Sequence, residues 1–156
     1  MLTQQRPIVQ QNDSPDGPPQ EPRTFVTVRP SVEVMSRQLL PYFIGISEDT
    51  AGATGLSMNM VIIPPGGSAA PHLHRGFESA IYVLEGRVET LYGPGLRQSM
   101  INEPGDFIFI PADVPHQPIN LSDTEPVRAI VVRNDPNEQE SVVLYDPAED
   151  DSCSEV

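Results

Sequence analysis

The sequence predicts an all-β domain, built as a single antiparallel barrel or sandwich. Short runs rich in β-branched and aromatic residues follow one another, with glycine and proline between them, and no stretch shows apolar residues at helical spacing. At 156 residues, the chain has room for one such domain and hardly for two.

The candidate strands lie between residues 25 and 146 and are separated by turn residues. The run Pro64-Pro65-Gly66-Gly67 ends one strand, because proline cannot donate a hydrogen bond to a sheet ladder. The run Tyr92-Gly93-Pro94-Gly95-Leu96 predicts a hairpin connection. The candidate strands are Phe25–Val28, Val32–Leu40, Tyr42–Ile46, Leu56–Ile63, Ser79–Leu84, Arg87–Tyr92, Arg97–Asn102, Phe107–Ile110, His116–Asn120, Val127–Arg133 and Val142–Leu144.

Both ends of the chain are predicted to lie outside the β domain. Residues 1–24 are rich in proline and glutamine with little to bury, so we expect a disordered tail there. Residues 147–156 form an acidic tail, which we expect to be solvated. This tail holds the single cysteine, Cys153, for which no internal disulfide partner exists and an exposed thiol without a role is expected.

The charge balance excludes two classes of partner. The chain has 22 acidic residues against 9 basic ones, all of them arginine, and a formal net charge of −13. Binding to nucleic acid or to anionic lipid depends on clustered positive charge, so neither partner is expected. No apolar run approaches the roughly 18 residues that span a bilayer, and no signal segment precedes the domain. We therefore predict a cytoplasmic protein.

The three histidines of the chain predict a metal site. His72 and His74 stand two residues apart, so on a strand both side chains point to the same face. His116 follows two prolines that fix the backbone before it. Glu78 has the parity of His74 but lies about 13 Å further along a straight strand, so the chain must bend, and Gly76 supplies a place to do so.

At these residues the sequence resembles the cupin superfamily. The segment Gly66-x5-His72-x-His74-x3-Glu78-x7-Gly86 resembles the first cupin motif, and Gly105-x5-Pro111-x-Asp113-x2-His116-x3-Asn120 resembles the second. The resemblance implies a small single-domain jelly-roll barrel over residues 25–146. It also implies one divalent metal ion on His72, His74, Glu78 and His116. Nitrogen and carboxylate ligands suit Mn, Fe, Ni, Cu or Zn better than Ca or Mg.

Two positions depart from the motifs. The usual gap between the glutamate and the glycine is six residues, whereas seven separate Glu78 from Gly86, so the alternative register places Ser79 at the ligand position. A carboxylate binds a divalent cation far better than a hydroxyl does, which favours Glu78. Asp113 stands where the family usually has glycine, and aspartate tolerates a left-handed turn.

The predicted site is compatible with more than one function. The first is a metalloenzyme, such as a dioxygenase, decarboxylase or isomerase, that acts on a small organic molecule. The alternatives are a noncatalytic module that binds metal or a small ligand, and a structural role. No catalytic residue beyond the metal ligands can be assigned. Arg133 and Arg37 are candidates to bind an anionic substrate, whereas Phe107, Phe109, Met58, Met60 and Tyr82 are expected to pack in the core.

The resemblance also implies a homodimer, because cupin domains often pair through sheet edges. The segment from Phe25 to Leu40 is the strand most available for exchange, and pairing would cover an open edge.

Overall fold

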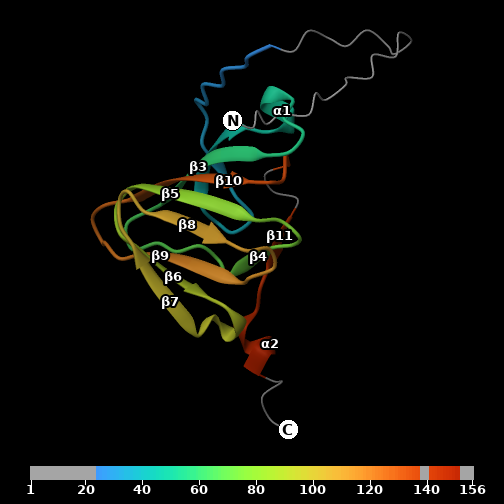
Figure 1. The fold of residues 1–156 in the computed structure, drawn as a ribbon. Coiled ribbons are helices and arrows are strands. Elements are labelled where there is room, and N and C mark those ends of the chain that lie inside the picture. The colour runs from blue at the N-terminus through green and yellow to red at the C-terminus, as the bar shows by residue number, and fades with distance from the viewer. Residues whose placement is uncertain (1–23, 138–140, 152–156) are drawn as a thin grey trace, which may run out of the picture.

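Two antiparallel sheets packed face to face make up the domain (Figure 1). The computed structural model describes residues 24–137 and 141–151. The predicted N-terminal disordered tail, apart from residue 24, and Cys153 lie outside these residues. The strands are β1 Val34–Met35, β2 Pro41–Ile46, β3 Ser57–Ile63, β4 His72–His74, β5 Ser79–Glu85, β6 Val88–Tyr92, β7 Gln98–Asn102, β8 Phe107–Ile110, β9 His116–Asn120, β10 Val127–Arg133 and β11 Val142–Leu144.

The strand order places distant parts of the chain side by side. The first sheet has the order β1-β2-β3-β10-β5-β8 and the second has the order β11-β4-β9-β6-β7, with every pairing antiparallel. Strand β10 thus lies between β3 and β5, and β9 lies between β4 and β6. The all-β prediction is confirmed, as two facing sheets and not as a closed barrel.

Most predicted strands after Leu56 are confirmed, and the earliest ones are wrong. Strands β8, β9, β10 and β11 have the predicted bounds. No strand forms over Phe25–Val28, and the predicted strand Val32–Leu40 contributes only the two residues of β1. Leu39 has a φ of 67°, a left-handed turn conformation that interrupts an extended run. Strand β4 carries the paired histidines and was not among the candidate strands.

Two short helices were not predicted either. Helix α1, Glu48–Ala51, begins at a capping box in which Ser47 and Thr50 each bond the other's backbone N–H. Helix α2, Pro147–Asp151, occupies the start of the predicted acidic tail. The Tyr145 hydroxyl bonds the carboxylate of Asp150 and accepts from the backbone N–H of Gly95 at 2.7 Å. Gly95 belongs to a 3₁₀ turn, η1 Pro94–Leu96.

None of the helices within the described ranges is long and apolar enough to cross a membrane. The cytoplasmic location stays a prediction.

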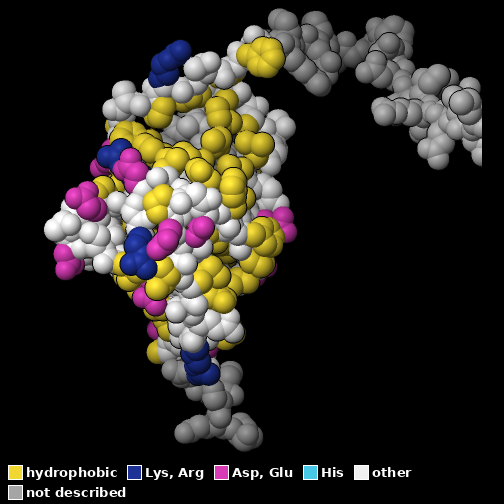
Figure 2. Space-filling model, turned by 60° about the vertical axis from the view of Figure 1, so that its left-hand side comes forward, with side chains coloured by type: hydrophobic (Ala, Val, Ile, Leu, Met, Phe, Trp, Pro, Cys, Tyr) yellow, Lys and Arg dark blue, Asp and Glu magenta, His cyan; other side chains and the backbone are white. Residues whose placement is uncertain are grey.

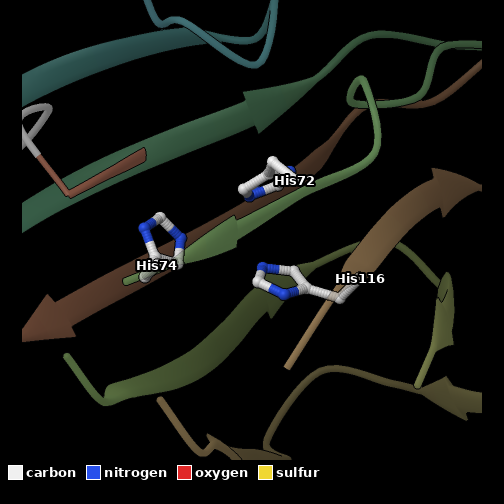
Figure 3. A group of neighbouring side chains, drawn as sticks. All are labelled: His72, His74 and His116. Atoms are coloured by element: carbon white, nitrogen blue, oxygen red, sulfur yellow. The ribbon is translucent and has the colours of Figure 1, made fainter. Parts of the chain in front are cut away.

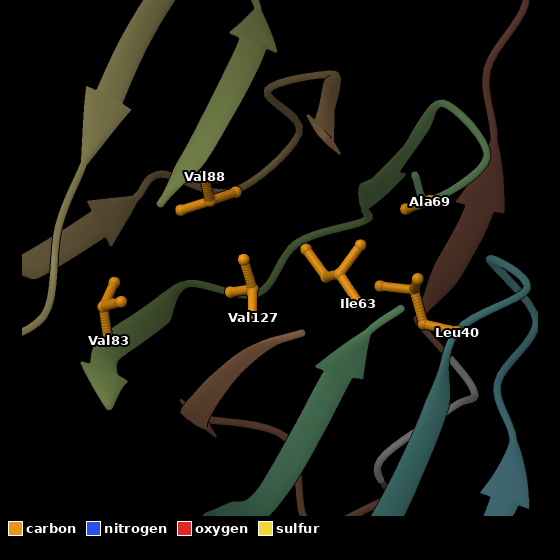
Figure 4. Close-up of a cluster of buried hydrophobic side chains, with 6 residues drawn as sticks. All are labelled: Leu40, Ile63, Ala69, Val83, Val88 and Val127. Atoms are coloured by element: carbon orange, nitrogen blue, oxygen red, sulfur yellow. The ribbon is translucent and has the colours of Figure 1, made fainter. Parts of the chain in front are cut away.

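The interior divides into an apolar end and a polar end. Alternate residues of β10 face inward, from the buried Val127 through Ala129 and Val131 to the buried Arg133. Val127 packs in the apolar core, whereas Arg133 lies about 20 Å further along the strand. The apolar cluster is shown in Figure 4 and comprises Leu40, Ile63, Ala69, Val83, Val88 and Val127.

The outer face of the first sheet is apolar as well. Phe107 and Phe109 of β8 are 84% and 62% exposed, and the Phe107 ring lies 4.7 Å from the ring of Tyr82 on β5. The prediction that Phe107, Phe109 and Met58 pack in the core is therefore wrong, since Met58 is also 41% exposed. Because Ile108 and Ile110 face inward on β8, strand alternation sends the phenylalanines outward.

Gly86 connects β5 to β6 at a point where no side chain fits. Its φ is +80°, and a Cβ atom there would lie 2.7 Å from the Pro126 carbonyl oxygen and 2.9 Å from Cγ2 of Val127. Gly76, in the turn after β4, has a similar φ of +76°, but a Cβ atom there would meet nothing within 4 Å.

Gly76 and Gly86 offer a matched test of the close packing around Gly86. We expect Gly76→Ala to lower the free energy of unfolding by about 1–2 kcal/mol, the cost of placing an L-residue in the left-handed region. Gly86→Ala should cost a further 1–3 kcal/mol or so, because the methyl group displaces the start of β10. Urea denaturation of both variants measures the difference, and equal losses would contradict the close packing at Gly86.

Candidate metal centre

Three buried imidazoles lie close together on the inward face of the second sheet. His72 on β4 pairs directly with His116 on β9, and His74 follows two residues further along β4 on the same face. The ring centroids lie 4.3 Å apart for His72 and His116, 5.1 Å for His72 and His74, and 5.5 Å for His74 and His116. Each ring offers one nitrogen, and these nitrogens all lie within 4.8 Å of one another (Figure 3).

The loops that follow β4 and precede β9 are joined to each other. The backbone N–H of Asp113 donates to the His74 carbonyl at 3.0 Å, and the Gly76 N–H donates to Oδ1 of Asp113 at 3.1 Å. Asp113 has a φ of 64°, so the expected left-handed turn forms with aspartate in place of glycine. These bonds fix the strand that carries His116 relative to the strand that carries the other two histidines.

Backbone carbonyls select the tautomer of two rings. Nδ1 of His72 lies 2.8 Å from the Ala70 oxygen, and Nδ1 of His116 lies 2.9 Å from the Val114 oxygen. Since a carbonyl oxygen only accepts, Nδ1 carries the proton in both rings and the Nε2 lone pair is left for another partner. Metal-binding histidines are held in this way, with the outer ring nitrogen donating to a carbonyl or carboxylate. The arrangement therefore fits a metal ion.

His74 is held differently. Its Nε2 lies 2.9 Å from Nη2 of Arg133, which can only donate, so in the neutral ring Nδ1 carries the proton. That Nδ1 is buried and has no hydrogen-bond partner. His74 thus has the lone pair that a metal ligand needs, but a guanidinium group occupies it.

The three imidazoles are neutral at physiological pH. Burial is the main cause and lowers the pKa of His72 to about 3 and of His116 to about 4. Burial, followed by the charge of Arg133, also holds the pKa of His74 far below its ordinary value. Because metal binding needs the deprotonated ring, all three side chains are in the binding form.

Glu78 does not join the histidines. Its side chain is exposed, and its backbone N–H donates to Oδ1 of Asn134 at 2.8 Å. Ser79 is 3% exposed and begins β5 on the inward face, paired with Ile110 on one side and Arg133 on the other. The bend at Gly76 forms as expected, but strand parity brings Ser79 to the position predicted for Glu78. The motif spacing agrees with this inward position of Ser79, because six residues, the usual gap, separate Ser79 from Gly86.

Arg133 reaches the histidines from the opposite sheet. It is only 6% exposed, and its Nε donates to Oγ of Ser79 at 3.1 Å. Burial lowers the pKa of Arg133 to about 10, while the nearby charge of Asp135 opposes this change, so the group remains a cation at neutral pH. Arg37, the other arginine expected to bind an anion, is exposed and does not line the cavity.

A cavity of about 90 Å³ adjoins the histidines. Its polar lining includes Gln38 and Asn59, which sequence reasoning missed because neither belongs to a recognisable motif. Apolar side chains from both sheets form the rest of its wall, among them Val61, Ile81, Ile108 and Val131. The space is sufficient for several water molecules or for a small organic molecule.

The comparisons with known proteins agree with this architecture. Residues 59–133 match the model of the cupin domain, a range that includes all three histidines and Arg133. No curated protein sequence matches the chain.

Three solved structures illustrate the shared fold. The polyketide cyclase RemF from Streptomyces resistomycificus is 25% identical, with a TM-score of 0.62 over 79% of this chain and 87% of that one. A protein with a double-stranded β-helix domain from Klebsiella pneumoniae is 19% identical, with a TM-score of 0.58 over 81% of this chain and 99% of that one. The oxalate decarboxylase of Lactobacillus farciminis, in a formate complex, is 22% identical, with a TM-score of 0.61 over 72% of this chain.

The chain spans only 33% of the length of that decarboxylase, so the likeness concerns about a third of that longer chain. The match over residues 59–133 identifies a cupin domain in this chain, and the two facing antiparallel sheets agree with it.

Proposed function

We propose that this cupin binds one divalent transition-metal ion on His72, His74 and His116 and uses it to act on a small organic molecule in the adjoining cavity. The observation that carries the proposal is the convergence of three neutral, buried ring nitrogens within 4.8 Å. Two of these rings already have their outer nitrogen bonded to a backbone carbonyl. Ligands oriented in this way lose little freedom when an ion binds.

The ligand set narrows the metal. Three imidazoles without a protein carboxylate suit Zn, Cu, Ni or Fe, whereas Mn has a stronger preference for oxygen ligands. Three protein ligands also leave coordination positions open, as in catalytic zinc sites. An ion with open positions polarises a bound carbonyl or carboxylate, or activates a water molecule. The chain's own contribution is a largely apolar cavity beside the histidines and the guanidinium of Arg133, which can orient a ligand there.

A noncatalytic metal- or ligand-binding module is the second candidate. It is favoured by the composition of the cavity wall, whose described residues include no carboxylate and no lysine to serve as a general base. Turnover separates the two candidates. We expect the metal-loaded chain to consume oxygen or release carbon dioxide with a member of a panel of small carboxylic acids and diketones. Tight ligand binding without turnover for every metal would favour the binding module.

The metal centre makes a direct prediction for two variants. His116→Gln should lower the affinity for Zn²⁺ or Ni²⁺ by about 100-fold or more, because losing a ligand costs at least as much as losing one of its supporting hydrogen bonds. Glu78→Gln should leave the affinity unchanged, since that side chain is exposed and apart from the histidines. Calorimetric titration of the metal-free protein measures both affinities. A loss in Glu78→Gln equal to that in His116→Gln would restore Glu78 as a ligand.

The buried imidazoles also predict how stability depends on pH in the metal-free protein. Above about pH 6.5 the histidines are neutral in both the folded and the unfolded chain. As the pH falls below 6.5, the unfolded chain takes up protons while the folded chain, with pKa values of about 3 for His72 and about 4 for His116, does not. The free energy of unfolding should therefore fall toward pH 5, by up to about 1.4 kcal/mol per pH unit for each histidine.

Denaturation of the metal-free wild type and of His116→Gln between pH 7 and pH 5 tests this prediction. The variant lacks one of the three groups, so its stability should fall less steeply. Parallel curves for the two proteins would show that His116 takes up its proton equally in both states.

We further propose that the chain forms a homodimer. Hydrophobic side chains gather on the face of the molecule that Figure 2 shows. In the segment from Phe25 to Leu40, Phe25 is fully exposed, and Val32, Met35 and Leu39 are each at least 65% exposed. Strand β1 of this segment is also the edge of its sheet, where unpaired backbone groups favour pairing with a second copy.

Light scattering after size exclusion should give the mass of two chains. Substituting Met35 and Leu39 by serine should shift the population to single chains. A wild type that is monomeric at all concentrations would overturn the proposed dimer.

A further inference from the structure

Strand β4, which carries two of the three histidines, is paired unequally on its two sides. It is only three residues long. On one side β9 pairs with it in register at one residue, where His72 faces His116. On the other side β11 pairs with all three of its residues, Leu144 with His72 and Val142 with His74 among them. The positions of both histidines therefore depend strongly on β11.

The pairing with β11 continues past both ends of β4. The backbone N–H of Arg75 donates to the carbonyl of Ser141 at 2.9 Å, and the N–H of Tyr145 donates to the carbonyl of Pro71 at 2.9 Å. Strand β11 thus covers the whole segment from which the two histidines project. Here we call residues 141–151, which comprise β11 and α2, the C-terminal clasp.

The clasp is also fastened near the third histidine. The hydroxyl of Tyr145 accepts from the backbone N–H of Gly95, in the turn η1, at 2.7 Å. The N–H of Gly93, at the start of this turn, donates to the carbonyl of Pro115 at 2.9 Å. Pro115 directly precedes His116. The clasp therefore connects the strand of two candidate ligands to the loop that leads into the third.

The position of the clasp allows it to open without the core. Strand β11 is the edge of its sheet, so only one of its sides is paired with another described strand. Leu144 is 62% exposed, and Ala148, Glu149 and Asp150 of α2 are exposed as well. Edge elements with few buried side chains open locally at a lower free energy than the core does.

We propose that metal binding at the histidines and docking of the C-terminal clasp stabilise each other, so that the clasp closes over β4 when an ion binds and loosens when it leaves. This inference rests on the proposed three-histidine centre and names the segment that is coupled to it. Ligand nitrogens must lie about 2.0–2.1 Å from an ion such as Zn²⁺, which requires an ordered β4. A docked β11 has already ordered β4, so the ion binds at a lower entropic cost.

Amide hydrogen exchange measures this coupling in the full-length protein. Exchange is followed by NMR in the metal-free protein and at saturating Zn²⁺. By linkage, the ion opposes opening of the clasp by the factor by which opening weakens the ion. We expect exchange at Arg75 and Tyr145 to slow by about 10-fold or more, within the usual range for coupled sites. The amide of Gly105, which donates to the carbonyl of Val83 in the apolar core, is the control and should be unchanged.

Two proline variants measure the same coupling from the side of the metal. Bonded and non-bonded pairs alternate along an antiparallel ladder. Since Tyr145 donates to the β4 segment, Val143 does so too, whereas the N–H of Leu144 points away from it at the edge of the sheet. Val143→Pro removes a ladder donor and should lower the affinity for Zn²⁺ by about 10-fold or more. Leu144→Pro is the matched control and should bind Zn²⁺ like the wild type, because proline is tolerated where the N–H of an edge strand faces solvent.

The outcomes separate the clasp from the metal centre. If calorimetry detects no Zn²⁺ binding to the wild type, the three-histidine centre is wrong and the coupling is overturned with it. Zn²⁺ binding without slower exchange at Arg75 and Tyr145, or with equal slowing at Gly105, overturns the clasp and leaves the centre intact. A folded Val143→Pro with the affinity of the wild type has the same meaning. If Val143→Pro does not fold, exchange in the wild type decides.

Discussion

The site depends on the register between β4 and β9. His72 stands directly opposite His116, and this single pairing places the two rings 4.3 Å apart before any ion is considered. Strand β11 pairs with the other edge of β4, so β4 is held on both sides. A slip of one residue in β4 would turn both of its histidines out of the interior. The bonds from Asp113 to the loop after His74 oppose such a slip, so the departure from the family motif at this position supports the site.

Placing three imidazoles and a guanidinium in the interior of a small domain has to be compensated by hydrogen bonds. Nδ1 of His72 and Nδ1 of His116 each bond the carbonyl two residues earlier, so this nitrogen of each ring is satisfied by the loop that precedes its strand. His74 depends on Arg133 from the other sheet. The polar end of the sandwich is thus joined across the two sheets through His74, which would have to exchange this partner if its Nε2 bound an ion.

The sequence predicted the parts of the structure that repeat a local pattern. Strands such as β8 and β10 alternate in a way that needs no knowledge of their neighbours, and both formed with the expected bounds. The predicted strand Phe25–Val28 failed because β-forming residues give a strand only where a neighbouring strand accepts their backbone bonds. At the site, the three histidines come together as expected. Glu78 was preferred over Ser79 on ligand chemistry, whereas the paired strands place Ser79 opposite Arg133 and leave Glu78 outside.

The net charge of the molecule and the charged side chain that lines the cavity have opposite signs. The chain has a net charge of −13, yet among the described residues that line the cavity Arg133 is the charged group. Surface charges act on a ligand through screening solvent, whereas a buried guanidinium acts at contact distance, so the interior decides affinity and the exterior affects approach. Repulsion by the exterior grows with the charge of the ligand. Molecules with several negative charges are therefore disfavoured at the surface.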